Sequence, residues 1–375
     1  MNRFASHLEA RHLPALDGLR AIAVGTVITY HAGMWGVPAD LGVSAFFVLS
    51  GFLITWLLLK EFQNTQDVSL RRFYLRRTLR IFPAYYAFLV LSYAIDRLHG
   101  APWDPAYAAS AAGYVVNYYN ALHGEPITSI THAWSLGVEE QFYLLWPLLF
   151  LFLMRRGIAR ARTVLVIVIA LVAVWRSWLY LRTGVGSAWV NNAFDTRADN
   201  LAVGCLLALS AGMARFERWA AWSAASPAAP LVTLGLLWAS RIDSAKAYHY
   251  SIGYTIDALL LAILVVQLIQ LSQHGVWSWL NWRWVRFLGT LSYSLYLYHN
   301  WGLTAGRHVP GGELGTFLAG VAGALALAGC SYFGIERPFL ALRDRLERRF
   351  WPKHGRSTIA SAGALPATLR SSSTR

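Results

Sequence analysis

The chain has 375 residues, of which 56% are apolar and 14% are charged, whereas an ordinary soluble domain is about 25% charged. This composition excludes a disordered chain, and a mean hydropathy of +0.40 favours one membrane-embedded unit over several soluble domains. The net charge of +14 raises nucleic acid as a partner, so the positions of the 33 Lys and Arg residues decide its meaning.

Apolar runs predict an all-α fold, a polytopic transmembrane helix bundle of about ten spans. Several runs are shorter than the ~20 residues that a bilayer core needs, which predicts tilted or partly re-entrant helices. We interpret one further run, 106–121, as re-entrant or interfacial. The ten runs are 19–37, 42–59, 81–95, 140–154, 163–181, 201–213, 227–240, 253–271, 285–304 and 314–334.

The placement of the positive charges orients these spans. With the N-terminus in the cytoplasm, 26 of the 33 Lys and Arg residues fall on the cytoplasmic side, which is a positive-inside pattern. A full span at 106–121 would move the four arginines of 155–162 to the other side. We therefore predict a multi-pass protein of the cell membrane with both termini cytoplasmic and no nucleic-acid partner. The membrane domain is 1–345, and 346–375 is a polar, disordered tail.

The first helix carries ionisable residues, which are costly in hydrocarbon and are functional by default. Arg20 and His31 are eleven residues apart, so they share a helix face about 16 Å apart along the axis. Asp17 precedes Arg20 by about one helical turn. The alternative is that Arg20 reaches the lipid headgroups and His31 only ends the helix.

A second cluster lies in HAWSLGVEEQFYLLWP. His132, Ser135 and Glu139 are spaced to line one helical stripe that enters the membrane from the outer side. Carboxylates near a helix N-terminus are also favoured by the helix dipole. That explanation suits Glu140 better than Glu139, which shares its face with a histidine.

A basic run precedes Pro83 and is first of all a topology signal. Its guanidiniums also suit a polyanionic cofactor, because arginine binds phosphate through two parallel hydrogen bonds. The residues of this candidate cofactor site are Arg71, Arg72, Arg76, Arg77 and Arg80.

Two further motifs supply supporting candidates. FDTRADNLAVG contains Asp195, Arg197 and Asp199, for which a structural Asp–Arg network is the favoured interpretation. LSYSLYLYHN places Tyr296 and His299 on one face near a helix end, where packing is the alternative. Phosphate-binding glycine loops, recurring metal-ligand spacings and G-x-S-x-G are absent from the sequence, so no metal is expected.

These motifs together resemble the acyltransferase family 3 integral-membrane O-acyltransferases. The resemblance runs from about 14 to 340 through LDGLRAIAVGTVITYH, GVSAFFVLSGFLIT, RRTLRIFPAYY, HAWSLGVEEQFYLLWP, DTRADNLAVG, LSYSLYLYH and IERPF. It implies a ten-helix enzyme that moves an acyl group, most often acetyl from cytoplasmic acetyl-CoA, to a hydroxyl of a sugar or other acceptor. No appended hydrolase-like domain follows the last helix here, which implies the stand-alone form.

The resemblance also assigns residues. The family's essential Arg and His fall on Arg20 and His31, its glutamate on Glu139, and its basic motif on Arg76, Arg77 and Arg80. We expect His31 to act as general base or as transient acyl carrier, and Glu139 to orient its imidazole. The basic cluster would hold the phosphates of acyl-CoA.

Three alternatives remain from sequence. The acceptor can be a small secondary metabolite instead of a glycan, or the chain can be a non-enzymatic glycan or lipid transporter, since intramembrane ionisable residues also mark substrate paths. No inverted repeat supports the transporter. A purely structural scaffold is disfavoured by the number of polar residues that share faces.

Overall fold

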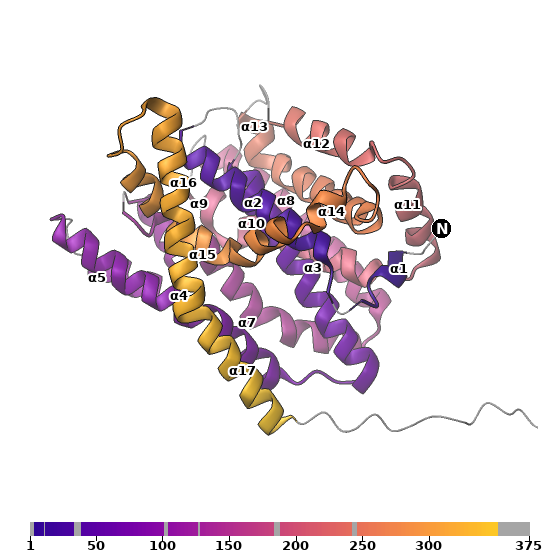
Figure 1. Cartoon of the computed structure of the whole chain (residues 1–375). Helices are drawn as coiled ribbons and strands as arrows, with labels where there is room; N and C mark the ends of the chain where they lie inside the picture. Colours follow the sequence, from indigo (N-terminus) through magenta and orange to yellow (C-terminus); the bar gives the residue numbers. More distant parts are fainter. Residues whose placement is uncertain are drawn as a thin grey trace, which may run out of the picture.

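The computed structural model describes residues 4–10, 12–33, 39–100, 104–126, 128–183, 188–241 and 246–351, and no strand occurs among them (Figure 1). The first half contains α1 (Phe4–His7), α2 (Pro14–His31), α3 (Ala39–Thr65), α4 (Leu70–Leu98), α5 (Pro105–Ala112), α6 (Val116–His123), η1 (Thr131–Ala133), α7 (Trp134–Arg155) and α8 (Ile158–Thr183). The second half contains α9 (Ala188–Asn192), α10 (Phe194–Ser210), α11 (Ala214–Ser223), α12 (Ala229–Ala239), α13 (Lys246–Tyr248), η2 (His249–Gly253), α14 (Tyr254–Leu271), η3 (Ser278–Asn281), α15 (Arg283–Gly306), α16 (Gly312–Ser331), η4 (Tyr332–Glu336) and α17 (Arg337–Phe350).

Each of the ten predicted apolar runs coincides with a helix over most of its described residues, and the all-helical fold class is confirmed; residues 34–37 of the first run lie outside the described residues. The count of ten spans and the cytoplasmic placement of both termini stay predictions. Within the described ranges, six helical stretches are long and apolar enough to cross a bilayer: Asp40–Thr65, Leu70–Leu98, Thr131–Arg155, Ile158–Arg182, His249–Leu271 and Gly312–Phe350.

The run 106–121 forms two short helices, α5 and α6, instead of one. Each has eight residues and is about 12 Å long, which is too short to cross a bilayer. At the other end of the chain, α17 continues to Phe350, so the first residues of the predicted tail are helical. The remainder of that tail, 352–375, lies outside the described residues.

The bundle buries polar side chains within its apolar core and exposes apolar side chains on its surface. Helix α10 lies near the centre (Figure 1), and its Arg197, Asp199 and Asn200 are buried. Helix α8 instead exposes apolar side chains such as Leu171 and Val174. Such a surface suits lipid, where apolar side chains need no cover and polar groups must find partners inside the protein.

Helices α3 and α10 approach each other closely through two glycines. A Cβ on Gly204 would lie 2.1 Å from the carbonyl oxygen of Val48, and one on Gly51 would lie 2.0 Å from that of Leu201. Small residues at helix crossings let backbones pack tightly within membranes. This contact fixes α10 against α3, and both helices contribute residues to the cavities described below.

We expect Gly204→Ala to destabilise the protein by about 1–3 kcal/mol, because the added methyl group meets backbone atoms that cannot move aside cheaply. Gly235→Ala in α12 is the matched control, since a methyl group added there would have no atom within 4 Å. The thermal unfolding midpoint in detergent should fall for Gly204→Ala only. Equal midpoints for the two variants would mean that the crossing is looser than described.

Candidate active site

Two cavities lie inside the bundle. The arginine cavity, of about 400 Å³, is lined among others by Asp17, Arg20, Arg77, Arg80 and Glu139. The histidine cavity, of about 750 Å³, is lined among others by His31, Glu125, His132, Arg197 and Asn300. The sequence-predicted residues that reach a cavity are therefore divided between two compartments.

The two cavities follow one another along the helices. On α2, Arg20 lines the arginine cavity and His31 lines the histidine cavity, about 16 Å further along the axis. On α3, which follows, Asp40 lines the histidine cavity and Ser50 the arginine cavity. Val43 and Tyr296 line both cavities, so a wall of few side chains separates them.

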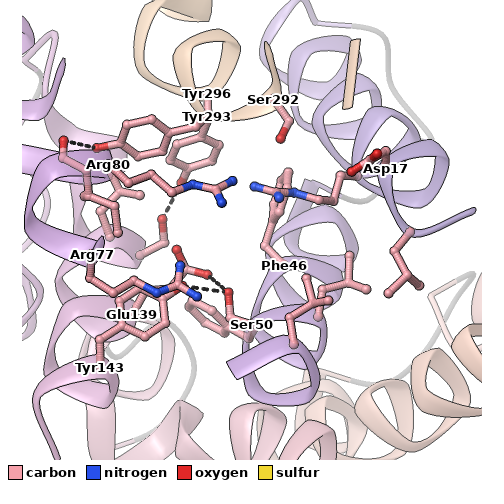
Figure 2. A pocket seen from close by; sticks show the side chains of 18 of the residues that line it. Asp17, Phe46, Ser50, Arg77, Arg80, Glu139, Tyr143, Ser292, Tyr293 and Tyr296 are labelled. Atoms are coloured by element: carbon pink, nitrogen blue, oxygen red, sulfur yellow. Dashed lines mark hydrogen bonds between the residues drawn. The ribbon is translucent and has the colours of Figure 1, made fainter. Parts of the chain in front are cut away.

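The arginine cavity holds three arginines that form no ion pair with a described residue. Among the described residues, no salt bridge joins Arg20, Arg77 or Arg80 to a carboxylate, although the carboxylates of Asp17, Glu139 and Glu140 line the same space. Figure 2 shows Arg77 and Arg80 beside this space. Neighbouring guanidiniums repel one another strongly where water is scarce, so a polyanionic ligand would stabilise this arrangement.

Glu139 belongs to a hydrogen-bonded group on one side of the arginine cavity (Figure 2). Ser50 donates to the Glu139 carboxylate, and the Ser50 hydroxyl lies 2.9 Å from that of Tyr143. The guanidinium of Arg77 lies over the Tyr143 ring at 4.8 Å. Neither Ser50 nor Tyr143 stands out in the sequence, because each lies in a motif that is typical of apolar packing.

The basic run divides into two groups on α4. Arg77 and Arg80 line the arginine cavity, whereas Arg76 donates to Glu347 of α17, with one contact at 2.8 Å. Arg72 lies 3.6 Å from the same carboxylate. Arg71 is exposed and lines neither cavity. The structure therefore brings only two of the five predicted arginines to a cavity.

A further basic cavity, of about 490 Å³, adjoins the arginine cavity and shares His12, Asp17 and Thr290 with it. Arg283 and Arg286 line this cavity, which we call the basic mouth. Neither arginine could be assigned to this site from sequence, since nothing in their spacing ties them to α2 or α4.

His31 is held in one tautomer by its own helix. Its Nδ1 lies 2.9 Å from the carbonyl oxygen of Val27. Because a carbonyl only accepts, Nδ1 carries the proton and Nε2 of the neutral ring has a free lone pair. A base of this form could accept a proton from a hydroxyl in the histidine cavity.

The rings of three histidines, His31, His132 and His299, lie close together beside the histidine cavity. The His299 ring is 4.8 Å from the His31 ring and 4.9 Å from the His132 ring. His132 contacts the Leu297 carbonyl through Nε2 at 3.2 Å and the Asn300 amide through Nδ1 at 3.1 Å. His132 and His299 are both buried; His132 lines the histidine cavity with His31, and His299 packs against both rings.

Tyr296 is central to the partition between the cavities. Its hydroxyl donates to the His132 carbonyl at 3.0 Å and lies 2.5 Å from the Ser135 hydroxyl. Ser135 lines the arginine cavity and His132 the histidine cavity. The predicted stripe of His132, Ser135 and Glu139 therefore runs from one compartment into the other.

The expected pairing of Glu139 with His31 is not what the structure shows. Glu139 lines the arginine cavity and bonds to Ser50, whereas His31 lines the histidine cavity and bonds to Val27. Residue spacing alone missed this, because it places side chains on a helix face without giving the relative height of two helices. The Val27 carbonyl has the orienting position that Glu139 was expected to occupy.

The predicted Asp–Arg network of α10 has a different arginine. Asp199 accepts from Arg176 of α8 at 2.9 Å and from Thr255 at 2.6 Å. Asp195 accepts from Trp175 at 2.6 Å. Arg197 is left without a carboxylate partner among the described residues and lines the histidine cavity.

A second ion-pair network closes the other side of the histidine cavity. Arg241 donates to both Asp40 and Asp257, and His249 lies 3.1 Å from Asp40. This network was not predictable from sequence, because its residues come from separate segments without a shared motif.

Comparison with known proteins adds independent information. A family model described as an acyltransferase domain matches residues 13–335. The peptidoglycan O-acetyltransferase OatA of Listeria monocytogenes is 32% identical over 312 residues, which cover 77% of this chain and 49% of that protein. The O-acetyltransferase OatA of Staphylococcus aureus is 31% identical over 314 residues, 77% of this chain and 50% of that protein. The chain thus spans about half the length of these relatives. No solved structure matches it.

Proposed function

Because the chain belongs to the acyltransferase domain family that matches most of its length, we propose that it is a multi-pass membrane O-acetyltransferase. It would transfer acetyl from cytoplasmic acetyl-CoA to a glycan hydroxyl on the other side of the cell membrane. The two stacked cavities carry this proposal, since they give the two substrates separate compartments that meet at one thin wall. The relatives named for O-acetyl transfer to peptidoglycan support a glycan acceptor.

The arginine cavity and its basic mouth would receive acetyl-CoA. Arg283 and Arg286 at the mouth, with Arg77 and Arg80 further inside, offer guanidiniums that suit the phosphates. The uncharged pantetheine arm would then extend along α2 towards Tyr296 and Val43. Arg20 lies on this path and would polarise the thioester carbonyl or hold a phosphate.

The histidine cavity would receive the acceptor. Nε2 of His31 would take the proton of a hydroxyl as its oxygen attacks the thioester carbonyl, and collapse of the tetrahedral intermediate would release the thiolate of CoA. The proton on His31 would then pass to that thiolate, which balances the reaction. Val27 keeps Nδ1 protonated throughout, so the same nitrogen accepts and returns the proton.

Purified protein in lipid nanodiscs, supplied with acetyl-CoA and peptidoglycan fragments, tests the proposal. We expect one acetyl ester on the glycan, detected by mass spectrometry, for each thiol released. Absence of thiol release with every glycan offered would contradict the proposal and favour the transporter. Incubation with acetyl-CoA alone addresses the mechanism, since an acetylated His31 would replace direct attack with a two-step route.

A further inference from the structure

Arg197 is a buried cation in the histidine cavity that lacks the partners such a group requires. Only 1% of its surface is exposed, and among the described residues neither its Nε nor its Nη1 has a hydrogen-bond partner. Its Nη2 donates to the Ser44 hydroxyl at 3.2 Å. A buried charge without paired hydrogen bonds costs several kcal/mol, so a partner from outside the chain would be strongly favoured.

The neighbouring carboxylates are already engaged. Asp199, two residues away on α10, contacts Arg176 and Thr255. Asp40, which lines the same cavity, contacts Arg241 and His249. Glu125, also in this cavity, accepts from Asn192 at 2.7 Å. None of them is in salt-bridge contact with Arg197.

Aromatic rings hold the guanidinium in place. It lies 3.7 Å from the centre of the Tyr254 ring, with the rings of Phe47 and Trp134 at 5.7 Å and 6.0 Å. Stacking stabilises the positive charge and fixes the plane of the guanidinium, but it satisfies no N–H group. The guanidinium of Arg197 is therefore a rigid fork with unused N–H donors, which is well suited to a planar, singly charged anion.

We propose that Arg197 binds a carboxylate carried by the acceptor, and that this contact makes the enzyme prefer acidic acceptors. The inference rests on the proposed function, because it takes the histidine cavity as the acceptor site. A carboxylate fits better than a dianionic phosphate, since Glu125 lines the same cavity without a salt bridge among the described residues and would repel the greater charge, whereas Arg241 is already paired with Asp40. The acceptor would thus be recognised at Arg197 while its hydroxyl lies at His31.

The test compares two acceptors that differ only in charge, the methyl glycoside of N-acetylmuramic acid and the carboxamide of the same compound. We expect the full-length enzyme to acetylate the acid with a kcat/KM about 10- to 100-fold higher than that of the amide, the range for a hydrogen-bonded charge. Arg197→Gln should bring the two values within about threefold of each other, and Arg197→Lys should keep part of the preference.

Arg182→Gln is the matched control, since Arg182 is an exposed arginine on α8 that lines neither cavity, and it should keep the full preference. Because the ratio of kcat/KM values compares two acceptors on one protein sample, a partial loss of folded enzyme lowers both values equally and leaves the ratio unchanged. If Arg197→Gln does not fold, Arg197→Lys provides the test.

Equal use of both acceptors by the unaltered enzyme would overturn this inference but would leave the proposed function standing. An undiminished preference in the Arg197 variants would do the same. Acetylation of neither acceptor, without thiol release, would count against the proposed function itself.

Discussion

His31→Ala is expected to reduce acetyl transfer by about 10²- to 10⁴-fold, because the variant loses the group that takes the proton of the attacking hydroxyl. The Val27 carbonyl fixes the proton on Nδ1, which leaves Nε2 as the base. The loss should appear in kcat, while the KM for acetyl-CoA changes little, since the arginine cavity is a separate compartment. Steady-state assays of thiol release in the presence of glycan measure both constants.

His99→Ala is the matched control for His31. His99 makes the same contact, from Nδ1 to a carbonyl four residues earlier at 2.9 Å, but it is exposed at the end of α4. Its replacement should leave turnover unchanged. Full activity of His31→Ala would contradict both the general-base route and the acyl-carrier route.

Arg80→Ala is expected to raise the KM for acetyl-CoA by about 10- to 100-fold with a much smaller change in kcat, because one hydrogen-bonded charge contact to a phosphate is lost. Arg80 lines the arginine cavity and has no salt bridge among the described residues. Titration of acetyl-CoA at saturating glycan separates the two constants.

Arg76→Ala gives the sharpest comparison, because it removes an arginine from the same helix that is already paired with Glu347 and lines neither cavity. We expect its KM to stay near that of the unaltered enzyme. If Arg76→Ala and Arg80→Ala raise the KM equally, the basic run acts through its overall charge and not through the cavity.

The fold class and the membrane character were within reach of the sequence, because hydrophobic runs report directly on helices that must bury or face apolar surroundings. The residues of the site were also largely within reach. Arg20, His31 and Glu139 each line one of the two cavities, and Tyr296 lines both.

The partnerships among these residues were not predictable. Spacing along one helix shows which residues share a face, but it does not show how far α2 and α7 are displaced relative to each other along their axes. This displacement places Glu139 in a different cavity from His31. In the same way, Asp199 pairs with Arg176 of another helix, which leaves Arg197 two residues away for a ligand. Such choices depend on packing between distant segments, as in the approach of Gly204 to Val48.

In the proposed reaction, the donor and the acceptor would reach the wall at Tyr296 and Val43 from opposite sides of the membrane. Sealed vesicles that contain the enzyme, with radiolabelled acetyl-CoA enclosed and a membrane-impermeant glycan added outside, test this arrangement directly. We expect labelled acetyl ester on the external glycan, and none when His31→Ala enzyme is used. Labelling that occurs only when both substrates are on the same side would contradict it.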